Sequence, residues 1–188
     1  MMTRFGPAWC ALRLSIVMPL LVAGSLEPQA HVTIDNAQSQ RGSFKARFNV
    51  THGCDGSPTN EVRITIPEGV IGVKPMPKPG WSLATTRGQY AKSYDYFHGK
   101  QVAEGVRSVT WSGGKLLNEH VDEFVLSIYV TDALKPGDIV HFPVEQICDA
   151  GKLLWVEKPA AGQDAHTLKA PAPGIKILPA NDDRKSSH

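Results

Sequence analysis

Short runs in which apolar and polar residues alternate constrain this chain more than any other feature. In the run 43–50, for example, Phe44, Phe48 and Val50 are separated by polar or small residues. Six runs follow the pattern: 43–50, 61–67, 107–113, 123–130, 139–148 and 152–158. A period of two places alternate side chains on one face of a strand. No run of ten or more residues has a clean helical period, so the pattern predicts strands.

Clusters of glycine, proline and aspartate separate these runs. They read HGCDGSPTN, MPKPG, SGG, LKPGD and DAGK. Many short strands with turn signals between them are typical of a β-sandwich. We therefore predict an all-β fold, an immunoglobulin-like β-sandwich in a single domain, with a hairpin turn at the DAG of residues 149–151.

The two ends of the chain read differently from the middle. Residues 1–30 are expected to be a cleavable signal peptide, with a basic start and the apolar stretch LSIVMPLLVA at 14–23. Cleavage is expected after Ala30, and a cut after Gly24 is the alternative. We expect the sandwich to span 31–159 and an extended, partly disordered tail to span 160–188. No later segment is long and apolar enough to be a membrane anchor.

Export implies an oxidising compartment, which bears on the cysteines. Cys10 would leave with the signal peptide, so Cys54 and Cys148 remain. An even pair is most simply one disulfide, closing a loop of about 95 residues and worth about 4–5 kcal/mol. A two-cysteine metal site is the alternative, without a C-x-x-C spacing to support it. The formal charge of +2 and the lack of a strong basic run argue against nucleic-acid or membrane binding.

His31 would be the first residue of the exported chain if cleavage follows Ala30. An N-terminal histidine offers its α-amine and its ring Nδ1 to one metal ion, and both lose a proton readily near neutral pH. Two nitrogen donors of this kind suit Cu(II). Without processing, the same residue is an ordinary histidine at an edge strand.

Several longer motifs resemble the YcnI-like family of exported copper-binding domains. They are AHVTI (30–34), NVTHGCDGSPTNEVRITIPEGVIGVKPMPKPGW (49–81), VTWSGG (109–114), DEFVLSIYV (122–130) and LLWVE (153–157). The resemblance extends from His31 to about Pro173. It implies an immunoglobulin-like β-sandwich that binds Cu(II) and is not an enzyme.

The resemblance also implies a site, a brace made by one N-terminal histidine together with a carboxylate and a nearby tryptophan. His31 matches the histidine and Trp155 matches the tryptophan. The family's glutamate is missing from the loop VTHGCDGSPTNE (50–61), where His52 lies closest to its place. Asp55 and Glu61 are alternative ligands in that loop.

Other residues receive more ordinary interpretations. Trp81 and Trp111 are expected in the core. The remaining histidines are expected to lie at the surface or to have their hydrogen bonds satisfied; they are His98, His120, His141, His166 and His188. His98 in the aromatic loop YDYFHGK is also an additional candidate ligand. Met76 is the only methionine after the signal peptide. A Cu(I) carrier would more often offer several thioethers, so one Cu(II) per chain is expected.

We therefore expect a periplasmic Cu(II)-binding protein that acts in copper trafficking or homeostasis as a chaperone or buffer. Its partners would be the copper ion and a periplasmic copper chaperone, a membrane copper transporter or an oxidase assembly pathway. Two alternatives stay open. One is a copper-dependent oxidative enzyme with a histidine brace, and the other is a metal-free interaction module, because a sandwich fold alone does not define a function.

Overall fold

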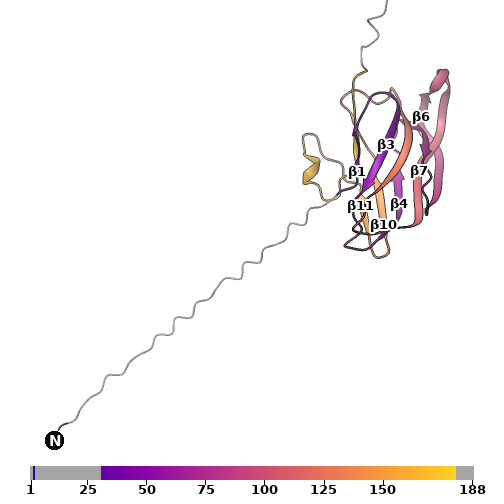
Figure 1. Ribbon diagram of the computed structural model, residues 1–188. Helices are drawn as coiled ribbons and strands as arrows, with labels where there is room; N and C mark the ends of the chain where they lie inside the picture. The colour runs from indigo at the N-terminus through magenta and orange to yellow at the C-terminus, as the bar shows by residue number, and fades with distance from the viewer. Residues whose placement is uncertain (1, 3–30, 181–188) are drawn as a thin grey trace, which may run out of the picture.

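Most of the alternating runs form strands in two main sheets (Figure 1). The computed structural model describes Met2 and residues 31–180, so the predicted signal peptide and its cleavage site lie outside the described residues. The first sheet has the order β1 (Thr33–Ile34), β3 (Gly42–Val50), β8 (Asp122–Val130) and β5 (Val70–Pro75). The second has the order β11 (Lys152–Trp155), β10 (Val144–Cys148), β4 (Thr59–Thr65), β7 (Gln101–Leu116) and β6 (Ser82–Asp95).

The hydrophobic core lies between the two sheets. Phe48 and Phe124 of the first sheet are buried with Val62 and Trp111 of the second, all at 1% exposure or less. The Trp111 and Phe124 rings meet edge to face with centroids 5.4 Å apart. The polar residues between the buried ones face outward, as the period of two requires. The prediction of an all-β sandwich is therefore confirmed.

The C-terminal part of the domain differs from the sequence expectation. A third sheet joins β2 (Gln38–Ser39), β12 (Gly174–Ile177) and β9 (Ile139–His141). Ile175 and Ile177 of β12 are each 1% exposed and belong to the main core cluster. The folded domain thus continues well beyond Pro159. The strand GIKI follows a proline-rich stretch and has only two inward-facing residues. A run this short does not show enough alternation for a strand to be predicted from the sequence.

The β6–β7 hairpin was also only partly predicted. The two strands pair from Ser82 opposite Ser112 to Asp95 opposite Gln101. Most of β6 is exposed, so polar residues occupy both of its faces and alternation is lost. The hairpin ends in a 3-10 turn, η1 (Phe97–Gly99), which carries His98. Within residues 31–180, no helix has the length and apolar character needed to cross a membrane.

Replacing Ile175 by alanine should lower the free energy of unfolding by about 2–4 kcal/mol, because it opens a cavity in the core. The matched control is Lys176→Ala on the same strand, an exposed position where a change within about 0.5 kcal/mol is expected. Urea denaturation of both variants measures the difference. Equal stabilities would show that β12 is not part of the cooperative fold.

Candidate metal centre

Strand pairing brings the first described residues next to the loop that follows β3. β1 is antiparallel to β3, with Thr33 opposite Asn49 and Ile34 opposite Phe48. Continued by two residues, this register places His31 opposite Thr51, the neighbour of His52. The sheet therefore brings together two histidines that the sequence separates.

Trp155 contacts both histidines. The His31 ring contacts the Trp155 ring with centroids 5.6 Å apart, and the His52 ring contacts it at 6.0 Å. Both contacts are edge to face. Trp155 ends β11, is paired with Val144 of β10 and is only 3% exposed. One buried indole thus orients both imidazoles, and the three residues expected at the site from the sequence lie together.

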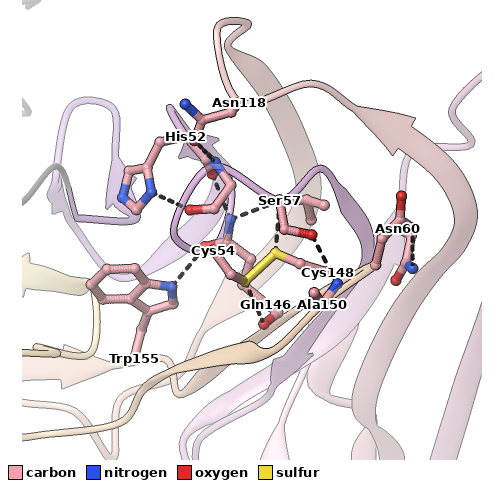
Figure 2. The surroundings of a disulfide bond; sticks show 12 residues. His52, Cys54, Ser57, Asn60, Asn118, Gln146, Cys148, Ala150 and Trp155 are labelled. Atoms are coloured by element: carbon pink, nitrogen blue, oxygen red, sulfur yellow. Dashed lines mark hydrogen bonds between the residues drawn. A yellow bond between two sulfur atoms is a disulfide. The ribbon is translucent and has the colours of Figure 1, made fainter.

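A fully buried side chain, Gln146, holds this arrangement from below (Figure 2). The indole Nε1 of Trp155 donates to Gln146 Oε1 at 3.0 Å. Gln146 Nε2 donates to the main-chain oxygen of His52 at 2.6 Å and to Thr59 Oγ1 at 2.8 Å. One amide therefore links the tryptophan to the histidine loop, and all its hydrogen-bonding groups are used inside the protein.

The loop after His52 is fixed by a disulfide and a tight turn. The predicted bridge between Cys54 and Cys148 is confirmed, and it joins this loop to β10 (Figure 2). A side chain at Gly53 would place its Cβ 1.9 Å from the main-chain oxygen of Ser57, so only glycine fits there. The Gly53 amide donates to Asn118 Oδ1 at 3.0 Å. The main chain beside His52 is therefore held on both sides.

The surroundings of His31 favour its neutral form. Its Nε2 is buried and has no hydrogen-bond partner among the residues that the structure describes. Burial is the main cause that lowers the pKa of His31, and the charges of His166 and His52 lower it further. A neutral imidazole retains a lone pair at neutral pH. With Nε2 facing inward, Nδ1 is the nitrogen that a chelate with the α-amine would use.

His52 is oriented by its own loop. Its Nδ1 lies within hydrogen-bonding distance of the main-chain oxygen of Gly53. A carbonyl oxygen can only accept, so Nδ1 carries the proton in this contact and the lone pair resides on Nε2. A main-chain carbonyl that fixes the tautomer in this way is a common partner of metal-binding histidines.

The carboxylates of the loop do not join the histidines. Glu61 accepts from Arg63 Nη2 at 2.7 Å, and Arg63 also contacts Glu145. These three residues alternate with Val62 and Gln146 and so lie on the outer face of the sheet. Asp55 is exposed in the turn of the loop, with a positive φ of 49°. Among residues 31–180, no group of three or more His, Cys, Asp or Glu side chains is close enough to hold a metal ion.

His98 lies at another part of the molecule. It belongs to η1 at the end of the β6–β7 hairpin, and its neighbour Phe97 contacts Tyr129 at 4.9 Å. Tyr129 is near the end of β8, whereas the His52 loop adjoins the start of that strand, where Val50 pairs with Asp122. The structure therefore does not bring His98 to the other site residues.

Three residues at or near the site were not recognised in the sequence. Gln146 could have been noticed in the sequence, because it is a polar residue at an inward position between Val144 and Cys148, where an apolar residue is expected. Asn118 and His166 gave none, since both lie in irregular segments. Their proximity to the site depends on the tertiary fold.

The match to known proteins agrees with this architecture. Residues 31–177 match the profile of the family described as "Domain of unknown function (DUF1775)". The chain belongs to the DUF1775 family. This is the YcnI-like family that the sequence motifs resemble. The matched region of the DUF1775 domain begins at His31 and ends with β12, which agrees with the structural boundary of the domain.

A solved structure shares the fold of this DUF1775 domain. It is described as "an uncharacterized protein from Nocardia farcinica" with an "immunoglobulin-like fold". The likeness has a TM-score of 0.58 and 25% sequence identity, and it covers 79% of this chain and 99% of that chain. The predicted immunoglobulin-like fold is thus confirmed. No curated protein matches the chain.

Replacing Gln146 by leucine should destabilise the domain by about 1–3 kcal/mol, because the Trp155 N–H and the His52 carbonyl would lose a buried partner. The matched control is Gln89→Leu, an exposed glutamine that bonds Glu104 at the surface. Urea denaturation measures the stabilities, and tryptophan fluorescence reports the environment of the indole. A Gln146 variant as stable as the control would contradict this role of the amide.

The lowered pKa of His31 predicts a loss of stability in acid. Above the ordinary histidine pKa of about 6.5, His31 is neutral in both the folded and the unfolded protein. As the pH falls through that value, the unfolded state takes up a proton before the folded state does, so the free energy of unfolding decreases. The decrease stops once the pH is below the pKa of His31 in the folded protein, because both states are then protonated.

NMR titration of the His31 ring in metal-free protein measures this shift directly. The free energy of unfolding, measured by urea denaturation at pH 7.5 and 5, should fall less between the two pH values in His31→Gln than in the wild type. In His98→Gln it should fall as much as in the wild type. A ring that titrates at or above the ordinary value would refute the prediction.

Proposed function

We propose that this protein binds one Cu(II) ion through a brace that begins at a processed N-terminal His31, and that it acts in the periplasm in copper trafficking or homeostasis. The observation that carries the proposal is that the His31 and His52 rings both contact the Trp155 ring, with centroid distances of 5.6 and 6.0 Å. Copper would be the cargo of a chaperone or buffer. A periplasmic copper chaperone and a membrane copper transporter are the partners that suit such a role.

The residues present fit a copper ion. His31 is disposed to be neutral and has Nε2 turned inward, which leaves Nδ1 for a chelate with the α-amine. His52 has Nδ1 at a carbonyl oxygen, so Nε2 is the ring nitrogen that would coordinate a metal. Three nitrogen donors of this kind match the preference of Cu(II) for tetragonal nitrogen coordination.

Trp155 and Gln146 would supply the rigidity of the site. Gln146 bonds both the indole and the His52 main chain, and the disulfide anchors the same loop. Holding the ligands in place before binding reduces the ordering cost of coordination. The ring of Trp155 beside both imidazoles would also exclude water from one side of the metal.

A copper-dependent oxidative enzyme is the second candidate. The histidine brace of such an enzyme contains a second histidine, and His52 contacts Trp155 as His31 does. Such enzymes usually bind a polysaccharide on a flat face with exposed aromatic rings. Among the aromatic residues of the described chain, Phe97 alone is exposed, and it lies at the tip of the β6–β7 hairpin. Release of oxidised sugars from cellulose or chitin, with reductant and peroxide, would favour the enzyme instead.

The proposed function requires that the exported protein start at His31. Intact mass and N-terminal sequencing establish the start, and Cu(II) titration of the same sample should then show one copper per chain and quenched tryptophan fluorescence. His31→Ala should weaken binding by at least about a hundredfold, since it removes the ring half of the chelate. One alanine added ahead of His31 should weaken it nearly as much, because the α-amine moves away. His98→Ala is the control and should bind as the wild type does.

Equal copper affinity of the extended and the native chain would refute the brace. A start upstream of His31 would do the same. A protein that begins at His31 and binds neither Cu(II) nor Cu(I) would favour the metal-free interaction module.

A further inference from the structure

A pocket of about 270 Å³ lies at the edge of the sandwich opposite the candidate metal centre. The strands nearest the metal centre, β1 and β11, stand at one end of the strand order in the two main sheets, whereas β5 and β6 stand at the other end. Figure 1 shows β6 on the far side of the molecule from β1 and β11. The lining of the pocket comes from β5 and from the β6–β7 hairpin. The pocket is therefore separate from the histidines.

All four tyrosines of the chain belong to one aromatic cluster beside this pocket. The rings of Tyr90 and Tyr94 meet edge to face with centroids 5.6 Å apart, and those of Tyr96 and Tyr129 do so at 5.1 Å. The cluster is distinct from the main core between the sheets. Tyr90 and Tyr96 also line the pocket, which gives it aromatic walls that a planar ring can contact.

Two glycines of the lining make room for the hydroxyl groups of these tyrosines. A Cβ added at Gly105 would lie 1.7 Å from Tyr90 Oη, and one added at Gly72 would lie 2.6 Å from Tyr96 Oη. Gly72 belongs to β5 and Gly105 to β7, and both line the pocket. Each hydroxyl therefore lies directly against a wall of the pocket, one at β5 and the other at β7.

Three donors of the pocket have no partner within the protein. In the part of the chain that the structure describes, the hydroxyls of Tyr90 and Tyr96 make no hydrogen bond, and Lys74 makes no hydrogen bond or ion pair. The neighbouring Tyr94 hydroxyl, in contrast, donates to Glu68 Oε2 at 2.9 Å. Tyr90 is only 8% exposed, and burial is the main cause that raises the pKa of its hydroxyl, which therefore keeps its proton. A ligand that accepts from these donors would remove the cost of leaving them unpaired.

The charges around the pocket favour a negative ligand. Arg87 Nη2 lies 3.6 Å from Glu104 Oε1, so these two charges of the lining offset each other. Outside the lining, Arg107 is paired with Glu68 at 2.7 Å. Lys74 is left as an uncompensated positive charge in the lining. A carboxylate has no donor of its own and accepts from ammonium and hydroxyl groups alike, so it matches this set.

We propose that this pocket binds a small aromatic carboxylate, whose charged group accepts from Lys74 and the hydroxyls of Tyr90 and Tyr96 while its ring packs against the two tyrosine rings. The volume is at the lower end of the range for ligand pockets, which suits a molecule of one or two rings. Binding requires neither a metal nor a processed N-terminus, so this site stands or falls apart from the proposed function.

NMR titration of isotope-labelled, metal-free protein with naphthoate tests the proposal. Backbone amide shifts should be confined to the strands that line the pocket and should saturate with a Kd of about 1 mM or lower. Two related probes separate the charge from the ring, because acetate has only the carboxylate and naphthamide only the ring. Each should bind at least about tenfold more weakly than naphthoate does.

Matched variants assign the donors. Lys74→Met removes the charge and keeps a long side chain, and it should weaken naphthoate binding at least about tenfold. Lys45→Met, at an exposed position on β3, is its control. Tyr96→Phe removes only a hydroxyl and should weaken binding about fivefold. Tyr129→Phe is the control for it, since Tyr129 contacts Tyr96 but does not line the pocket. The amide spectrum of each variant shows whether it is folded.

Saturable binding that needs the ring, the carboxylate and Lys74 would establish the site. Shifts outside the pocket, or shifts that do not saturate, would overturn it. Equal affinity for naphthamide and naphthoate, or equal affinity of Lys74→Met and the wild type, would refute the recognition of a carboxylate. Acetate that binds as tightly as naphthoate would refute the role of the aromatic walls.

Discussion

The hydrogen bonds of the buried Gln146 amide underlie the arrangement of the metal centre. A carboxamide with no access to water must place its donors and acceptor on fixed partners, because each one left unpaired costs about 1–3 kcal/mol. Gln146 meets this demand with Trp155, His52 and Thr59, which come from three different segments. The requirement of one side chain therefore determines where the indole and the histidine loop lie relative to each other.

The disulfide acts on the same segments through a covalent bond. Cys148 lies two residues after Gln146 on β10, and Cys54 lies two residues after His52. The bridge and the amide thus tie the same loop to the same strand at two nearby points. Strands hold Gln146 and Trp155, and a crosslinked loop holds His52. A site held in this way before binding would lose less conformational freedom when a metal ion arrives.

The sequence predicts those parts of the structure that local periodicity encodes. The sandwich strands at 43–50 and 123–130 were expected because one face of each is apolar. The cysteine pairing followed from there being only two cysteines after the expected signal peptide. The β6 strand and β12 were missed, since β6 is polar on both faces and β12 has only two inward residues. At the site, motifs pointed to His31, His52 and Trp155. Gln146 stands out in the sequence only as a polar residue at an inward position of β10, and its partners His52 and Thr59 are known only from tertiary contacts between positions about ninety residues apart.

Under the proposed function, an imidazole of His52 in place of the family's carboxylate would change the electrostatics of the centre. A carboxylate ligand would offset one of the two positive charges of Cu(II), and this favours the divalent ion over Cu(I). With Glu61 engaged by Arg63, the side-chain donors of the proposed centre are the His31 and His52 rings, so no carboxylate would offset the charge of a bound ion. Imidazole ligands also suit copper more generally than hard oxygen ligands do. Under the proposed function, this chain would therefore discriminate less between the two oxidation states than a relative with the carboxylate, and it would be better able to retain copper when the ion is reduced.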